Sequence, residues 1–238
     1  MISSQFKALA LSACVMLSAC GGGGDGDDGE TVSAKPCAGT TTAKVQLYGD
    51  STQEGFVGAS GTLAVNTPTV ALQAAADARY GAGRLSVTSR ARTGSTSQGL
   101  LAGTDDRNFA WPDPVDADVV VMNHGRNDRV HFGLERLPEY APTLQKLIDL
   151  TPKGTVMIFE TPNWAGAYDL APYAAVMRQV AANNGVAVAD VFAYTEALPD
   201  RVAQIPDLAH PSDALYKAFV TGVVAPAVFK VTDPILCQ

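Results

Sequence analysis

The chain has 238 residues, of which 47% are hydrophobic, so it can bury a substantial core. Its formal net charge is −7, from 17 Lys and Arg against 24 Asp and Glu. No basic stripe stands out in the sequence, which excludes the electrostatic footprint of a nucleic-acid-binding protein. Beyond the N-terminal region, about 200 residues remain, a length that suits one domain.

The N-terminal segment is expected to be a signal sequence and not part of the fold. Lys7 supplies a positive charge, and residues 8–17 form an apolar run too short to span a bilayer comfortably. The run ends in Leu17-Ser18-Ala19-Cys20, which resembles the bacterial lipobox. That resemblance implies removal of residues 1–19 and attachment of diacylglycerol to Cys20. An ordinary signal peptide with a chance cysteine is the alternative.

Residues 20–36 are expected to form a flexible tether between this anchor and a domain at 37–238. Four glycines and then an acidic stretch follow Cys20, and such a composition cannot bury apolar surface. The prediction is therefore a lipoprotein of the bacterial cell envelope, periplasmic and on the outer membrane. The sequence is not expected to hold a second apolar span long enough to cross a membrane.

Two of the four cysteines are expected to form a disulfide. Cys14 leaves with the signal sequence and Cys20 takes the lipid, so Cys37 and Cys237 remain, one at each end of the domain. In an oxidising compartment, such a pair favours a disulfide over metal ligation. The loop-entropy model gives a contribution on the order of 5 kcal/mol for so long a loop.

Strand-length apolar runs alternate with helical patterns along the domain. The expected strands are 45–48, 85–88, 118–122, 155–159 and 186–191, and the expected helices are 69–80, 141–150, 171–184 and 213–224. This alternation predicts a parallel sheet with helices on both faces. The fold class is therefore α/β, a three-layer α/β/α sandwich of flavodoxin-like type with about five strands.

Three short motifs supply the parts of an acyl-transfer site. Gly49-Asp50-Ser51 follows the first strand and offers a nucleophile, and Gly125-Arg126-Asn127-Asp128 follows the third strand and offers an amide donor. Asp207-Leu208-Ala209-His210 offers an acid–base pair in one tight turn. Because ligands bind at the carboxyl ends of parallel strands, the first two motifs should meet at one edge of the sheet. Alone, each motif is a weak signal.

Together these motifs resemble the sequence blocks of the SGNH (GDSL-type) hydrolase family. The resemblance implies that Ser51 is the nucleophile, that His210 is the general base and that Asp207 orients His210. It also assigns a further motif, Arg92-Thr93-Gly94-Ser95-Thr96, as the block whose glycine donates to the oxyanion. The implied oxyanion hole is then formed by Ser51, Gly94 and Asn127. Arg126 departs from the small or uncharged residue usual at its position.

The implied reaction is ester hydrolysis through an acyl-enzyme, with no cofactor and no metal. A zinc site built on His124 and His131 lacks the spacing of known motifs. Candidate substrate-binding residues are Arg126, His124 and Trp164, although a structural role for His124 is the stronger alternative. Other residues on the loops near the site could line the pocket or simply pack: Trp111, Tyr168, Arg90 and Arg92.

The sequence also bears on the size and polarity of the substrate. No long apolar lid segment is evident, which favours a small acyl group, such as acetyl, on a polar carrier such as an envelope glycan. Hydrolysis of lysophospholipids or thioesters is the alternative. A non-catalytic binding lipoprotein on the same fold is a third reading, but all four motifs keep their reactive residues. The oligomeric state is left open.

Overall fold

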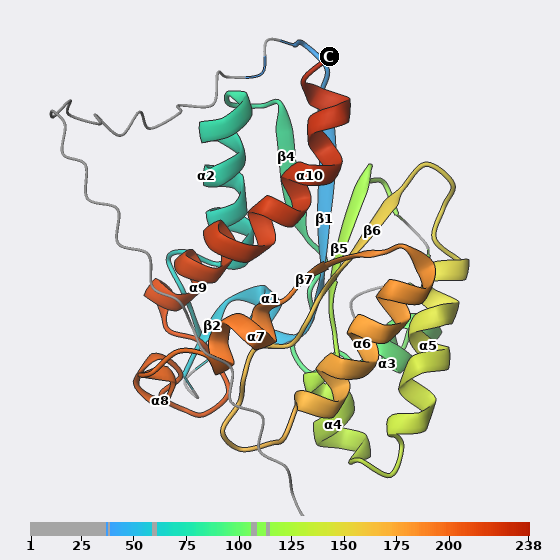
Figure 1. The fold of residues 1–238 in the computed structure, drawn as a ribbon, viewed down its shortest axis with the longest axis vertical. Helices are drawn as coiled ribbons and strands as arrows, with labels where there is room; N and C mark the ends of the chain where they lie inside the picture. Colours follow the sequence, from blue (N-terminus) through green and yellow to red (C-terminus); the bar gives the residue numbers. More distant parts are fainter. Residues whose placement is uncertain (1–36, 38, 59–60, 106–108, 113–114) are drawn as a thin grey trace, which may run out of the picture. The chain divides into compact units, whose positions relative to one another are not determined.

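Five parallel strands form the central sheet. They are β1 (Ala43–Gly49), β4 (Leu85–Ser89), β5 (Val119–Asn123), β6 (Val156–Glu160) and β7 (Ala187–Ala189), in the order β4-β1-β5-β6-β7. Every neighbouring pair is parallel (Figure 1). All residues of β5 are buried, as expected for a parallel strand covered on both faces. The predicted α/β fold with a five-stranded parallel sheet is confirmed.

The computed structural model describes residues 37, 39–58, 61–105, 109–112 and 115–238. The predicted signal peptide, the lipidation site at Cys20 and the tether up to residue 36 lie outside these residues. The strands and helices given below all belong to the described part of the chain.

Alternate residues of β5 face two different hydrophobic clusters. Val119 and Val121 join one cluster with helical residues such as Leu72 and Tyr216, whereas Val120 and Met122 join the other with residues such as Leu144 and Met177. This is the period of two that a strand imposes on its side chains. The long helices of the two layers are α2 (Pro68–Tyr80), α5 (Leu137–Asp149), α6 (Ala171–Asn184), α9 (Asp213–Phe219) and α10 (Ala225–Leu236).

Several short elements carry no periodic pattern and were not expected from the sequence. They are α1 (Ser51–Glu54), β2 (Phe56–Val57), β3 (Thr62–Leu63), α3 (Ser97–Ala102), α4 (Arg126–Phe132), α7 (Val191–Glu196) and α8 (Arg201–Gln204). The strand expected at 186–191 is shorter in the structure, where β7 covers only Ala187–Ala189. Asp190 ends it by capping α7, where its carboxylate accepts a hydrogen bond of 3.2 Å from the Ala193 N–H.

The C-terminal helix continues well beyond the expected end at residue 224. A π-helical turn, η1 (Val220–Val224), joins α9 to α10, and the Ala225 N–H bonds to the Val220 carbonyl. The wider turn leaves room for Pro226, which has no N–H and would clash with the carbonyl four residues earlier in a regular helix. Pro226 therefore does not end this helix.

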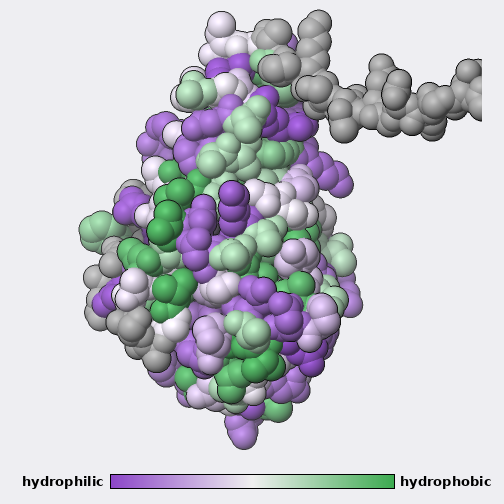
Figure 2. All heavy atoms as spheres, turned by 90° about the vertical axis from the view of Figure 1, so that its left-hand side faces the viewer, coloured by the Kyte–Doolittle hydropathy of each residue, from purple (hydrophilic) through white to green (hydrophobic). Residues whose placement is uncertain are grey.

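The whole segment Asp213–Leu236 is long and apolar enough to cross a membrane by length and composition, contrary to the expectation of no second span. It instead packs against the sheet, where Phe219 and Val228 are almost fully buried in the core. Figure 2 views the side of α2 and α9 and shows hydrophilic and hydrophobic residues interspersed over it. The segment is thus a core helix of the domain.

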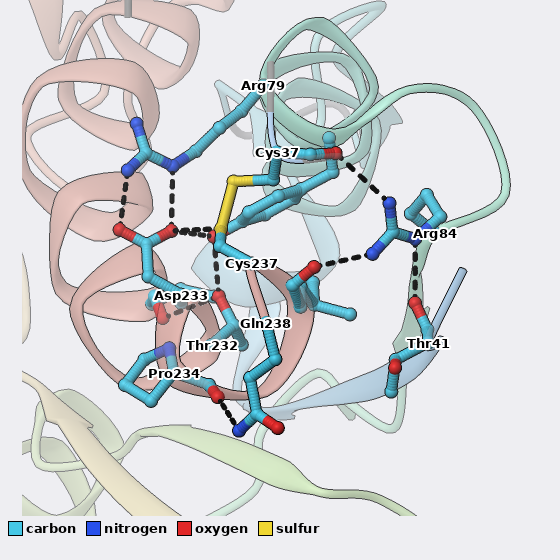
Figure 3. The surroundings of a disulfide bond; sticks show 12 residues. Cys37, Thr41, Arg79, Arg84, Thr232, Asp233, Pro234, Cys237 and Gln238 are labelled. Atoms are coloured by element: carbon cyan, nitrogen blue, oxygen red, sulfur yellow. Dashed lines mark hydrogen bonds and ion pairs between the residues drawn. A yellow bond between two sulfur atoms is a disulfide. The ribbon is translucent and has the colours of Figure 1, made fainter. Parts of the chain in front are cut away.

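The two ends of the domain are fastened together at the amino ends of the strands. A disulfide joins Cys37 to Cys237 across 200 positions of sequence (Figure 3). Beside it, Arg84 donates to the carbonyls of Thr41 at 2.7 Å and Leu236 at 2.6 Å. Cys37, Asp233 and Cys237 are the one cluster of possible metal ligands found in the described residues, and the disulfide occupies both of its sulfurs.

Asp233 ties the C-terminal helix to α2. Its carboxylate accepts from Arg79 Nε at 2.9 Å and from the Tyr80 hydroxyl at 2.7 Å (Figure 3). The hydrogen bond from Arg79 is the main cause that holds the pKa of Asp233 below its usual value. A carboxylate with a lowered pKa stabilises the fold at neutral pH, and this contribution is lost as the pH falls through that pKa.

We expect Asp233→Asn to lower the free energy of unfolding by about 1 kcal/mol at neutral pH. The difference from the wild type should shrink as the pH is stepped toward acid, and urea unfolding at each pH measures it. Asp116→Asn is the control, because Asp116 pairs with Lys44 at the surface and its side chain is 80% exposed. A deficit for Asp233→Asn that stays constant down to acid pH would contradict this account.

Candidate active site

The predicted nucleophile lies at the turn from β1 into α1. Asp50 caps α1, since its Oδ1 accepts from the Thr52 N–H and the Thr52 hydroxyl, both at 2.8 Å. Gly49 is required here, because a Cβ would lie 2.6 Å from the Asn123 carbonyl oxygen. Ser51 is the first residue of α1 and opens onto the cleft at the carboxyl end of the sheet.

Ser51, His210 and Asp207 form a continuous chain of hydrogen bonds. Ser51 Oγ lies 2.9 Å from His210 Nε2, and His210 Nδ1 lies 2.7 Å from Asp207 Oδ2. With the ring proton on Nδ1, Nε2 is free to accept the serine proton. The structure thus brings together three residues that the sequence separates by up to 159 positions.

The environment of Asp207 keeps it ionised. Burial pushes the pKa of Asp207 upward, but hydrogen bonds from the His210 backbone, the His210 ring and the Ala209 backbone outweigh it, and the net pKa is lowered. The two backbone bonds to Oδ1 measure 2.7 Å and 3.0 Å. A negative carboxylate beside Nδ1 stabilises an imidazolium, which is what a general base becomes after it takes a proton.

The predicted oxyanion donors meet in one cleft of about 340 Å³. Ser51, Gly94 and Asn127 line it, together with His210. Asn127 Nδ2 donates one hydrogen bond of 3.1 Å to the Ser95 carbonyl, which fixes the orientation of the amide. Because an amide nitrogen carries two hydrogens, one is left for a ligand.

His124 lies behind the cleft and not in it. Its side chain is buried, and its Nε2 lies 3.2 Å from Ser95 Oγ. The Ser95 hydroxyl donates its hydrogen to the Asp105 carboxylate at 3.1 Å. Burial lowers the pKa of His124 against the opposing effect of nearby carboxylates, so the ring is neutral at physiological pH. The substrate-binding role predicted for His124 does not fit this position, and its contacts support the loop that carries Gly94.

The described lining of the cleft also does not include Trp164, the other aromatic candidate. Its ring packs against the core and against Arg201, whose guanidinium carbon is 4.9 Å from the ring centre. Trp111 is buried, with its indole N–H bonded to the Leu147 carbonyl at 2.8 Å. Both tryptophans are therefore packing residues in this structure, although sequence alone left them open as pocket residues.

Phe56 and Arg126 complete the cleft next to the reacting atoms. Phe56 comes from the short β2–β3 hairpin, and its ring centre lies 6.3 Å from that of His210. Arg126 Nη1 donates to Ser51 Oγ at 3.1 Å and lies 3.5 Å from His210 Nε2. Phe56 was not expected from the sequence. Its only signal there was the run of glycines around it, which marks an irregular loop after the nucleophile.

A buried polar network lies beneath the nucleophile. Glu160, at the end of β6, accepts from Asn123 Nδ2 at 3.1 Å, and the Gln53 amide nitrogen, turned toward it, is 3.2 Å away. Burial raises the pKa of Glu160 to about 8, so this carboxyl is protonated at neutral pH. Gln53 belongs to α1, so the network joins the helix that begins at Ser51 to strands β5 and β6.

The arrangement has the parts that acyl transfer requires. A hydroxyl faces an imidazole nitrogen, the imidazole is oriented by a carboxylate, and amide donors line the same cleft. Such a set can attack an ester carbonyl and stabilise the negative charge that develops on its oxygen.

Comparison with known proteins shows the family and the fold of the chain. Residues 47–218 match the GDSL-like lipase/acylhydrolase family. No curated protein matches the chain at a significant level. Among solved structures, a lipase/acylhydrolase from Enterococcus faecalis is similar with a TM-score of 0.64 at 18% identity, covering 82% of this chain and 97% of that chain.

Two further structures share the fold. An acetylxylan esterase from Geobacillus stearothermophilus, crystallised as a catalytic mutant, has a TM-score of 0.59 at 21% identity, covering 80% of this chain and 94% of that chain. An α/β hydrolase from the metagenome of Lake Arreo, Spain, has a TM-score of 0.59 at 25% identity, covering 83% and 96%. Since the family match spans most of the chain, the protein belongs to the GDSL-like lipase/acylhydrolase family and hydrolyses ester bonds.

Proposed function

We propose that the protein is a serine esterase that works through an acyl-enzyme on Ser51. The observation that carries this proposal is the unbroken chain from Ser51 Oγ to His210 and on to Asp207, with distances of 2.9 Å and 2.7 Å. His210 takes the serine proton as Ser51 attacks the ester carbonyl, and it then gives that proton to the leaving alcohol. Water activated by His210 releases the acid and restores Ser51.

The oxyanion is met by the N–H groups of Ser51 and Gly94 and by the Asn127 amide. Gly94 has a positive φ of 81°, a conformation in which glycine lets the backbone approach the substrate without strain. One donor of this kind typically lowers the barrier by about 3–4 kcal/mol. No metal or organic cofactor enters these steps, since the protein's own groups transfer the proton and stabilise the charge.

The substrate we propose is a short acyl ester, such as an acetyl ester, on a polar carrier such as an envelope glycan. A cleft of about 340 Å³ lies at the small end of the range for ligand sites, and Thr93, Arg126 and Asn127 offer polar groups in it. The similarity to an acetylxylan esterase is consistent with this substrate class. A lysophospholipase or thioesterase is the alternative, and it would need room for a long acyl chain.

The place we propose for the enzyme is the cell envelope, with a lipid on Cys20 and the domain in the periplasm at the outer membrane. Support comes from the lipobox-like sequence before Cys20 and from the Gly-rich and acidic segment after it. The disulfide between Cys37 and Cys237 is typical of an oxidising compartment.

Ser51→Ala should abolish hydrolysis of p-nitrophenyl acetate, because it removes the nucleophile, and should leave the thermal unfolding midpoint nearly unchanged. A fluorophosphonate should label the wild type on Ser51, located by mass spectrometry, and should not label the variant. Ser86→Ala is the control, since Ser86 is exposed on β4. Full turnover by Ser51→Ala would contradict the assignment of Ser51 as the nucleophile.

The chain-length preference tests the substrate class. We expect kcat/KM for p-nitrophenyl esters to fall steadily from acetate to longer acyl chains, because the small cleft cannot hold them. Release of acetate from an acetylated glycan, measured directly, should accompany this preference. Faster turnover of long-chain esters would instead favour the lipid-hydrolase alternative.

Cys20→Ser tests the anchor. In cells, the wild type should incorporate a labelled fatty acid and sediment with membranes, whereas the variant should do neither and should keep its esterase activity. Cys20 precedes the domain predicted at 37–238 and is not among the residues that line the cleft, so the substitution should not disturb it. A wild type that takes up no lipid would overturn the proposed anchoring without touching the proposed chemistry.

A further inference from the structure

Arg126 places a positive charge directly over the reacting atoms. It is the first residue of α4, and Gly125 before it, with a φ of 129°, turns the chain from β5 into the cleft. Nη1 of Arg126 lies 3.1 Å from Ser51 Oγ and 3.5 Å from His210 Nε2. A guanidinium is always charged in proteins, so this end of the cleft is cationic at every relevant pH.

Within the described residues, no carboxylate pairs with Arg126, although other arginines are neutralised. Arg79 pairs with Asp233, Arg136 with Glu139, and Arg178 with Asp190. Arg126 makes hydrogen bonds only through Nη1, and its Nε is buried with no hydrogen-bond partner. A partly buried cation without an anion costs desolvation free energy, so the site is complementary to a negative group that is absent from the protein itself.

We propose that Arg126 binds a carboxylate carried on the alcohol half of the ester, close to the esterified oxygen. The preferred substrates are then O-acyl hydroxycarboxylates, the chemical class that includes acylated acidic sugars. This inference deepens the proposed function and rests on Ser51 acting as the nucleophile. Arg126 is, in this view, a specificity-determining residue of the esterase.

The position of His210 assigns the carboxylate to the alcohol half. His210 Nε2 must protonate the leaving oxygen, so the alcohol lies on the His210 side of the carbonyl carbon. Arg126 Nη1 is within 3.5 Å of that same nitrogen. The oxyanion lies toward Gly94 and Asn127, which line the cleft as its donors. A carboxylate whose carbon is two or three bonds from the leaving oxygen therefore falls within reach of the guanidinium.

Binding would also change the contacts of the nucleophile. Without a ligand, Arg126 donates to Ser51 Oγ. A substrate carboxylate is a stronger acceptor and can take both prongs of the guanidinium fork, which releases the serine oxygen for attack. The reaction remains ordinary hydrolysis: the ester C–O bond breaks, water supplies the hydroxyl of the acid, His210 returns a proton to the alcohol, and the carboxylate leaves unchanged on that alcohol.

The test compares matched charged and neutral esters. O-acetyl-lactate carries a carboxylate on the alcohol half, and O-acetyl-lactamide is its neutral counterpart. Monoethyl succinate and ethyl succinamate form the matching pair for the acyl half. For each pair, kcat/KM of the charged ester is divided by that of the neutral ester, so that intrinsic differences between enzymes cancel.

We expect Arg126→Gln to lower this ratio for the lactate pair by about 10- to 100-fold, the range for a hydrogen bond to a charged group. The ratio for the succinate pair should change little, and Arg126→Lys should give an intermediate lactate ratio because it keeps the charge and loses the fork. Arg136→Gln is the matched control, since it removes the same charge from an exposed ion pair outside the cleft.

Three outcomes would overturn the inference. One is an unchanged lactate ratio, another is a loss confined to the succinate pair, and the third is an equal loss on charged and neutral esters, which would make Arg126 a general stabiliser of the transition state. The ratios are compared between the wild type and variants that still hydrolyse p-nitrophenyl acetate. If the wild type lacks that activity, the proposed function itself has failed.

Discussion

The candidate site depends on the backbone pairing of β1 with β4 on one side and β5 on the other. Gly49 pairs in register with Asn123 of β5, and Leu47 pairs with Ser89 of β4. Beyond the end of β4, the Arg90 and Arg92 N–H groups still bond to the carbonyls of Leu47 and Gly49, at 2.7 Å and 2.9 Å. The loops with Ser51, Gly94 and Asn127 are therefore placed by main-chain hydrogen bonds, which side-chain substitutions do not remove.

The histidine turn is held in a different way. Leu208 has a φ of 60°, the one positive value among the described residues that are not glycine, and such a conformation costs about 1 kcal/mol or more. Asp207 offsets this cost by accepting two N–H groups of its own turn, and Asn163 Nδ2 donates to the Ala209 carbonyl at 3.1 Å. Asp207 thus shapes the turn and orients the imidazole with the same carboxylate.

The features that could be predicted from the sequence are those with a repeating apolar pattern or a fixed residue spacing. All five strands, the long helices up to residue 224 and the order of the motifs were expected, from apolar periodicity, from short motifs such as Asp207 to His210 and from their resemblance to a known family. Helix α10 was not expected. What could not be predicted depends on where one side chain points. His124 directly follows β5 and is buried, whereas Arg126, two residues later, begins α4 and points to Ser51. Phe56 sits on a two-residue strand, too short to give a pattern.

The disulfide that joins residues 37 and 237 also sets how the enzyme can be attached to anything else. Strand β1 starts near this bond and runs its full length before it reaches Ser51, so the disulfide lies at the end of the sheet opposite the cleft. A linker or solid support joined to the domain next to the disulfide would attach at that end of the sheet and not at the cleft. Such an attachment point and the reacting atoms of Ser51 are separated by the length of β1.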